Sequence, residues 1–219
     1  WVGRIGVALE PLANRLHALL LREAVLHADE TPVKQLDPGK GKTKRAYLWA
    51  YRTTPLSTAP PLIVFDYHPG RSGAHARDFL GEWVGHLMVD DYAGYKALWS
   101  QGITELGCLA HARRKFYELA QANESPQATE VLRRIGELYA IEDRAQALSI
   151  DARAALRAEL ALPRLDALHL WMINTRKQTA DGGALARALD YSLKRWPALA
   201  RYATRGDLPI DNNPVEHAI

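Results

Sequence analysis

The sequence predicts an α/β fold in which a mixed sheet, an antiparallel meander plus parallel strands, is joined to a large all-helical insertion. Two observations support this prediction. Short apolar and aromatic runs, typical of strands, recur between residues 24 and 108 and are separated by turn signals. From about residue 117 to residue 205 these runs disappear, and apolar residues recur at helical spacing instead. Strands followed by a block of helices favour a mixed α/β core.

A leading helix is expected over residues 1–23. Four leucines recur there at helical spacing, which places them on one stripe of the helix surface. These are Leu12, Leu16, Leu19 and Leu20.

Three strands in hairpin order are expected next. The first is the mostly apolar run 24–31, the second is Tyr47–Tyr51, and the third is the run 62–65, which follows a Pro-Pro break. Residues 34–45 contain turn dipeptides and one acid, Asp37, so a solvated basic turn is expected there. Its basic residues are Lys34, Lys40, Lys42, Lys44 and Arg45.

A helix and two more strands complete a predicted core of residues 24–116. The segment 72–83 has aromatic and leucine residues at helical spacing. A fourth strand is expected at His86–Asp90 and a fifth at Ile103–Cys108, which leads into a helix through Phe116.

Residues 117–205 are predicted to form the helical insertion, and residues 206–219 the start of a last core helix, truncated by the end of the chain. Two apolar stripes at helical spacing define the insertion. They are Val131, Ile135, Leu138 and Tyr139, and then Leu185, Leu189, Leu193 and Trp196.

Composition excludes several classes of protein. The 219 residues are 47% hydrophobic with a formal net charge of +3, so disorder is excluded as the main state. The single cysteine, Cys108, excludes an intramolecular disulfide framework, and no run of about 18 apolar residues predicts a membrane span. We therefore expect a soluble globular protein of a reducing compartment, and the charge permits a nucleic-acid partner without requiring one.

Two carboxylates follow apolar, strand-like runs. Asp29 follows residues 25–28 and Asp90 follows residues 87–89. If the first and fourth strands are neighbours, these carboxylates emerge side by side, and a cation between them would relieve their repulsion. Mg²⁺ prefers such oxygen ligands. Glu216, after an Asp-Asn-Asn-Pro helix start, is the candidate third ligand of a two-metal site, although spacing alone equally allows ordinary turn and cap roles.

Four segments, in this order, resemble one known family. They resemble the transposase of the insertion-sequence-66 family, a bacterial DDE-type transposase, and the resemblance extends from about residue 7 to the end of the chain. The segments are His27-Ala-Asp-Glu-Thr-Pro32, Val89-Asp-Asp-Tyr-Ala-Gly-Tyr95, Gly107-Cys-Leu-Ala-His-Ala-Arg-Arg-Lys-Phe116 and Asp211-Asn-Asn-Pro-Val-Glu216.

The resemblance implies a ribonuclease-H-like core in which Asp29, Asp90 and Glu216 are catalytic and hold two Mg²⁺ or Mn²⁺ ions. It implies phosphodiester hydrolysis and strand transfer at the ends of an insertion sequence. The implied partner is double-stranded DNA, both element ends and target, with a homo-oligomer assembled on the DNA. The implied location is the bacterial cytoplasm, associated with the nucleoid and without a membrane.

Two positions depart from the family pattern. The family commonly has Gly where this chain has Asp91, so Asp91 remains a possible site residue. It usually has Arg where this chain has His217, and an Arg would hold a phosphate at any pH whereas a His is mostly neutral near pH 7. Members of the family also resemble longer chains, so the sequence is expected to be an interior piece of a longer protein.

The resemblance makes several basic residues candidate contacts to DNA phosphates. Clusters of basic residues more usually form ordinary solvent-exposed surfaces. Cys108-x-x-His111 resembles half a zinc site, but a packing cysteine beside a histidine near the catalytic cleft or DNA is the favoured interpretation. The candidate DNA-binding residues are Lys40, Lys42, Lys44, Arg45, Arg71, His111, Arg113, Arg114, Lys115 and His217.

Two alternatives remain open on sequence alone. One is a ribonuclease-H-like nuclease that cuts without strand transfer. The other is an inactive, truncated transposase remnant that acts only in DNA binding.

Overall fold

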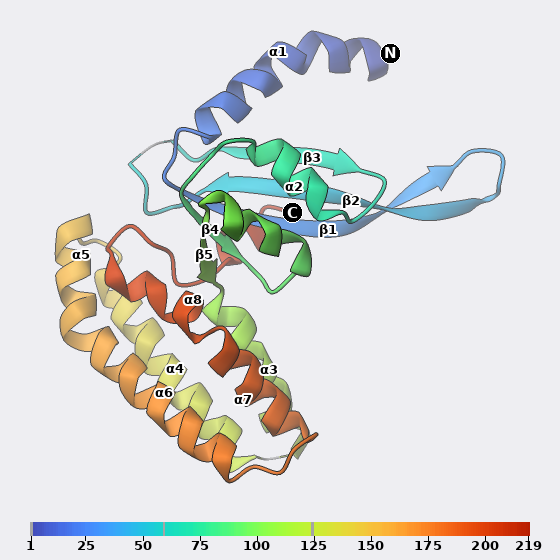
Figure 1. The fold of residues 1–219 in the computed structure, drawn as a ribbon. Helices are drawn as coiled ribbons and strands as arrows, with labels where there is room; N and C mark the ends of the chain where they lie inside the picture. Colours follow the sequence, from blue (N-terminus) through green and yellow to red (C-terminus); the bar gives the residue numbers. More distant parts are fainter. Residues whose placement is uncertain (1, 59, 124) are drawn as a thin grey trace. The chain divides into compact units, whose positions relative to one another are not determined.

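A computed structural model describes residues 2–58, 60–123 and 125–219 (Figure 1). The chain divides into two compact units, one formed by residues 1–105 with 212–219 and the other by residues 106–211. The last residues of the chain therefore belong to the same unit as the first hundred. Each unit is described by itself below.

A five-stranded sheet forms the centre of the first unit, and its last strand crosses the boundary between the units. The order of the strands is β3-β2-β1-β4-β5. β1 pairs antiparallel with β2, β2 antiparallel with β3, and β1 parallel with β4. The predicted mixed sheet and α/β class are confirmed. The strands are β1 (Val25–Asp37), β2 (Lys42–Thr53), β3 (Ile63–His68), β4 (His86–Val89) and β5 (Thr104–Gly107).

The hairpin of β1 and β2 differs from the prediction. The expected basic turn over residues 34–45 is wrong for most of that segment, because β1 continues to Asp37 and β2 begins at Lys42. The turn itself is short, and Gly39 and Gly41 supply its positive φ angles of 81° and 60°. In β1 the residues from 31 to 37 are alternately more and less exposed, whereas residues 42–45 of β2 are all exposed.

Four helices belong to the first unit: α1 (Val2–Leu20), α2 (Gly73–Leu80), the 3₁₀ helix η1 (Ala93–Gln101) and α9 (Asn213–Glu216). The Ser72 hydroxyl caps α2 by accepting a hydrogen bond from the Ala74 backbone N–H. The predicted leucine stripe of α1 is buried only at its end, since Leu20 is fully buried while Leu12 is 57% exposed.

The core of the first unit lies on one face of the sheet. Trp49 and Tyr51 of β2 point into it together with Ala28 of β1 and side chains from α2 and η1. No helix is predicted at η1, because its apolar residues follow no regular helical stripe.

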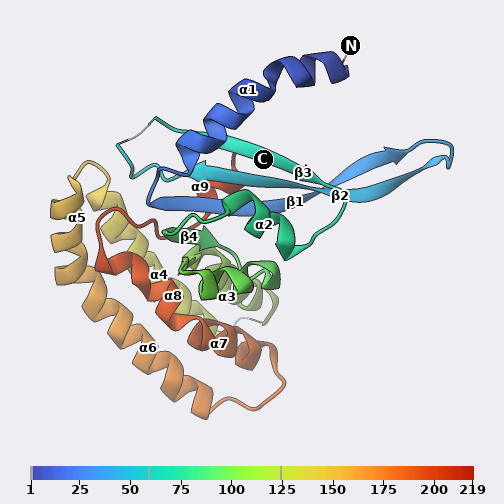
Figure 2. The ribbon, with the colours of Figure 1, turned by 45° about the horizontal axis from the view of Figure 1, so that its top comes forward.

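The second unit is helical, as its sequence predicts, and Figure 2 shows its helices in a second view. No described helix is long and apolar enough to cross a lipid bilayer. The elements are α3 (Leu109–Asn123), α4 (Pro126–Ala145), α5 (Ile150–Leu156), a short π-helix η2 (Arg157–Ala161), α6 (Leu162–Lys177), α7 (Ala184–Lys194), α8 (Trp196–Ala200) and the 3₁₀ helix η3 (Arg201–Thr204).

Candidate functional site

Two aspartates lie at one edge of the sheet of the first unit. β1 and β4 are parallel neighbours, with Leu26 opposite Leu87 and His27 opposite Met88. Continuing that register brings Asp29 of β1 level with Asp90, the residue that follows β4. The first and fourth strands are therefore neighbours, which is the condition under which the two carboxylates emerge side by side. The Asp90 carboxylate accepts a hydrogen bond of 2.9 Å from the Tyr92 backbone N–H.

Glu216 lies on α9, which packs against β1 and β2. The pKa of Asp29 is raised from 3.8 to about 6, mainly by burial and then by the negative charges of Asp90 and Glu216. Asp90 is thus level with Asp29 on a neighbouring strand, and the helix that carries Glu216 contacts the strand of Asp29, although more than 120 residues separate Asp90 from Glu216.

The other acids of these segments point elsewhere. Asp91 is exposed. Glu30 follows Asp29 directly, so its side chain leaves the opposite face of the strand and enters the core. There it accepts a 2.7 Å hydrogen bond from the Tyr95 hydroxyl and a 3.0 Å hydrogen bond from Nε of Arg71. Burial is the largest influence on Glu30 and raises its pKa to about 7, although both partners act to lower it.

Arg71, a predicted DNA contact, therefore forms an ion pair with a buried carboxylate. Its guanidinium also lies 3.9 Å from the centre of the Tyr92 ring, a cation–π contact. About 41% of the Arg71 side chain remains exposed. Arg71 therefore contacts two groups next to the aspartates. They are Glu30, which directly follows Asp29, and Tyr92, whose backbone N–H donates to Asp90.

A buried pair of side chains joins α9 to β1. Asn212, directly before α9, donates a 2.9 Å hydrogen bond from Nδ2 to the Ala28 carbonyl. Its Oδ1 must then face His27, whose Nδ1 lies 3.0 Å away and donates to it. Burial is the main reason that the pKa of His27 falls to about 4, so the ring is neutral at pH 7. Nδ1 of His27 therefore carries the ring proton.

A second contact holds α9 to β2. The Arg52 guanidinium donates to the Pro214 backbone carbonyl. His27 and Arg52 are directly opposite each other across the hairpin, so their side chains leave the same face of the sheet. Asp29 also leaves that face, since it lies two residues beyond His27. α9 is thus fixed on the face that Asp29 occupies.

The three carboxylates are candidate ligands of a divalent cation. Negative charges that raise the pKa of a neighbouring carboxyl destabilise its ionised form, and a bound cation reverses that effect. Oxygen ligands from Asp and Glu are those that Mg²⁺ and Mn²⁺ prefer. The residues that would hold the ion are Asp29, Asp90 and Glu216.

The predicted DNA contacts fall into separate groups. Four of them, Lys40, Lys42, Lys44 and Arg45, lie at the far end of the β1–β2 hairpin, and all are exposed. His217 follows α9 and is exposed.

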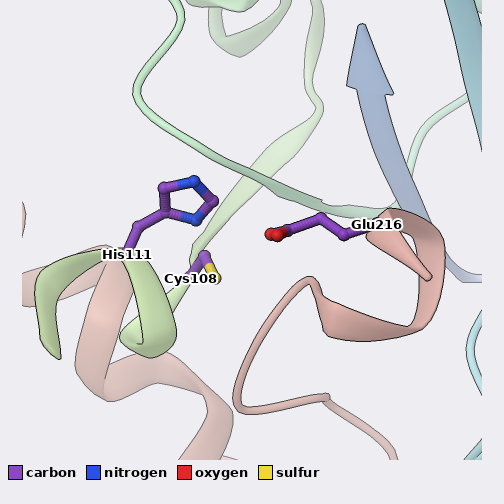
Figure 3. A group of neighbouring side chains, drawn as sticks. All are labelled: Cys108, His111 and Glu216. Atoms are coloured by element: carbon purple, nitrogen blue, oxygen red, sulfur yellow. The ribbon is translucent and has the colours of Figure 1, made fainter. Parts of the chain in front are cut away.

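The remaining candidates belong to the second unit. Cys108 directly precedes α3, and His111 lies in its first turn (Figure 3). Cys108 is 1% exposed, as expected of a packing cysteine. Arg113, Arg114 and Lys115 are exposed on α3, and the Lys115 ammonium lies 4.3 Å from the centre of the Tyr191 ring.

Sequence reasoning did not assign a role to His27, Glu30 or Asn212. All three are buried polar residues within the motifs that carry the acids. A polar residue inside an apolar strand was a usable signal for His27 and Glu30, because burying such a group needs a partner. The sequence predicts a helix cap at Asn212. In the fold, the side-chain amide of Asn212 instead donates to the Ala28 carbonyl of β1.

Comparison with known proteins identifies relatives of the whole chain. A family model described as "Transposase IS66 family" matches residues 1–219. The uncharacterized protein y4qI of Sinorhizobium fredii is 35% identical over 231 residues, an alignment that covers 100% of this chain and 43% of that protein. The uncharacterized protein y4jD of the same organism is 31% identical over 229 residues, which cover 100% of this chain and 45% of that protein. The chain thus spans less than half the length of these relatives. No solved structure matches it.

Proposed function

Because the chain belongs to the IS66 transposase family, we propose that it is the catalytic part of a DDE-type DNA transposase with a ribonuclease-H-like core. The observation that supports this proposal is the parallel pairing of β1 with β4, which brings Asp29 level with Asp90 on the face of the sheet where α9, with Glu216, is held. The proposed reaction is divalent-metal-dependent phosphodiester hydrolysis and strand transfer at the ends of an insertion sequence, in the bacterial cytoplasm.

The chemistry needs no covalent intermediate between protein and DNA. In the first step water attacks a phosphodiester at the element end, the bond from phosphorus to the leaving oxygen breaks, and a 3′-hydroxyl is left. In the second step that hydroxyl attacks a phosphodiester of the target in line, the bond from this phosphorus to the target's 3′ oxygen breaks, and the target strand is left with a free 3′-hydroxyl. Two Mg²⁺ or Mn²⁺ ions bound to the carboxylates would supply an activated nucleophile and charge stabilisation of the leaving oxygen.

The residues around the carboxylates would act by positioning. The contacts of Asn212 and Arg52 hold α9, and with it Glu216, on the face of the sheet that Asp29 occupies. The ion pair of Glu30 with Arg71 would hold β1 in position from the face of the sheet opposite to Asp29. Rigid placement of the ligands matters, because a preorganised site avoids reorganisation when charge develops on the phosphate.

The test is cleavage of DNA containing an element end by the wild type and by Asp29→Asn, with Mg²⁺ or Mn²⁺ present. Asp29→Asn is expected to abolish strand cleavage and to leave DNA binding largely intact, since it removes one metal ligand and no basic residue. The matched control is Asp91→Asn, which makes the same change at an exposed neighbour. Full cleavage by Asp29→Asn would refute the assignment.

Joining is measured separately with pre-cut element ends and a target duplex. Strand transfer by the wild type supports a transposase. Cleavage without transfer would instead identify a nuclease, and DNA binding without either reaction would identify an inactive remnant.

A further inference from the structure

The far end of the β1–β2 hairpin is a two-stranded ribbon. β3 pairs with β2 only over residues 47–52, and β4 pairs with β1 only over residues 25–27. In the pairings of the described strands, residues 33–37 and 42–46 therefore pair only with each other. Figures 1 and 2 both show this ribbon continuing past the other strands of the sheet. We call residues 33–46 the ribbon.

The net positive charge of the chain is concentrated in the ribbon. It has five basic residues and one acidic residue, a net charge of +4, whereas the whole chain has +3. All the other residues together therefore have a net charge of −1. This concentration of positive charge attracts a polyanion, so it fits nucleic acid rather than a neutral surface.

One face of the ribbon continues the face that holds Asp29. Side chains alternate along a strand, and directly opposite residues share a face. Asp29 is opposite Ala50, and Ala50 is opposite Phe65 of β3. Further along the same face lie Lys44, opposite Gln35, and Lys42, opposite Asp37.

Two exposed aromatic side chains also lie on this face. Phe65 is 43% exposed and Tyr67 is 45% exposed. The Tyr67 hydroxyl donates a 2.5 Å hydrogen bond to Oε1 of Gln35, which ties the ribbon to β3. The face from Asp29 to Lys42 thus carries the acidic site, two exposed aromatic rings and two lysines, with the buried Ala50 and Ala46 between them.

We propose that this face of the ribbon binds the duplex DNA that flanks the cut phosphate. The proposal rests on the proposed function, because it takes the position of the cut from Asp29. Gln35 lies six residues beyond Asp29, which at a rise of about 3.3 Å per residue is about 20 Å along the strand. At about 3.4 Å per base pair, Lys44 therefore contacts a phosphate about six base pairs from the cut.

Arg45 and Lys34 point away from this face. They share the opposite face of the ribbon with Leu36, which is 77% exposed. The proposal thus assigns DNA contact to Lys42 and Lys44 and separates them from basic neighbours one residue away.

The test compares Lys44→Glu with Lys34→Glu, two exposed lysines of the same ribbon on opposite faces. Binding of a labelled duplex of arbitrary sequence is measured by fluorescence anisotropy at 0.15 M salt, where the Debye length of about 8 Å limits long-range effects of the charge change. All proteins are made in the Asp29→Asn background, so that no DNA is cut. Phosphate contacts carry no sequence information, so the element end need not be known.

Lys44→Glu is expected to weaken binding about tenfold, and Lys44→Ala is expected to lower the slope of log K against log salt by about 0.9, the value for one lost phosphate contact. Lys34→Glu is expected to change the affinity less than about threefold, as a charge outside the contact does through a screened field. Equal losses for the two lysines, or none for Lys44, would overturn the proposal. Circular dichroism melting confirms that each variant is folded.

The outcome is separable from that of the proposed function. If Lys44→Glu binds normally while cleavage by the chain depends on Asp29, the inference fails and the proposed function stands. If Lys44→Glu alone loses binding while the wild type cleaves no DNA, the ribbon binds DNA and the proposed function fails.

Discussion

Asp29 lies in an environment unlike that of an ordinary surface acid. Its pKa is raised from 3.8 to about 6, first by burial and then by the charges of Asp90 and Glu216. A carboxyl whose pKa is raised by folding favours the folded state in its protonated form. The free energy of unfolding that it contributes is present below its unfolded pKa near pH 4 and is lost as the pH rises to about 6. A shift of about two pKa units corresponds to a loss of at most about 3 kcal/mol.

Asp29→Asn is therefore expected to be more stable than the wild type at pH 7.5 in EDTA, by about 1–3 kcal/mol. The gain is expected to disappear at pH 4, where the wild-type carboxyl is protonated too. Urea unfolding followed by circular dichroism at both pH values measures it. Asp91→Asn serves as the control, and equal stability of Asp29→Asn and wild type at pH 7.5 would contradict the raised pKa.

At the scale of elements, α9 depends entirely on its contacts. A helix of four residues has too few internal hydrogen bonds to be stable in isolation. Its position follows from the hydrogen bonds of Asn212 to Ala28 and His27, and of Arg52 to Pro214. These contacts are not metal ligands, but they determine where Glu216 lies.

Asn212→Ala is expected to weaken Mn²⁺ binding by about tenfold or more, the effect typical of removing a group that orients a ligand. It leaves the Ala28 carbonyl and Nδ1 of His27 buried without their partner, and releases α9. Isothermal titration calorimetry with Mn²⁺ measures the change. Asn213→Ala, at the neighbouring position, is the matched control and is expected to bind Mn²⁺ nearly as the wild type does. Wild-type affinity in Asn212→Ala would show that α9 is held without this amide.

The β1–β2 hairpin shows where sequence reasoning about elements fails. Charged residues and an Asp-Pro-Gly sequence over 34–45 indicate a loop, yet most of that segment is strand. Polar side chains suit a strand that faces solvent on both sides, and such a strand has no apolar alternation to reveal it. Pairing of β1 with β2, rather than the local strand propensity of these residues, determines the structure there.

At the scale of the whole molecule, each unit combines an apolar core with a buried charged group. The sheet unit has an apolar core around Trp49 and Tyr51. The helical unit contains Arg157, which is fully buried. Its guanidinium forms an ion pair of 2.5 Å with Glu142 and donates to the carbonyls of Tyr202 and Leu208 at 2.9 and 3.0 Å. This one side chain ties η2 to α4 and to the segment after α8.

Arg157→Ala is expected to destabilise the protein by about 3–5 kcal/mol, because it leaves Glu142 and several buried carbonyls without their partner. Arg133→Ala removes an arginine that forms two ion pairs on the exposed face of α4, and little change is expected. Urea unfolding of both variants measures the contrast. Equal losses of unfolding free energy in the two variants would show that the buried hydrogen bonds and ion pair of Arg157 contribute no more to stability than the exposed ion pairs of Arg133.

The sequence by itself determined the class of most segments and named the candidate acids, although it missed the far end of the β1–β2 hairpin and η1. Local periodicity is enough to distinguish strands from helices, and the order of the motifs is enough to indicate the family, which the comparison confirms. Which groups meet was decided by the tertiary structure alone. His27 and Asn212 are 185 residues apart in the chain, and a contact of that kind depends on the path of the chain between them rather than on local preference. For the same physical reason the sequence named Asp29, Asp90 and Glu216 as candidates, and only the parallel pairing of β1 with β4 and the return of α9 to β1 placed their charges together.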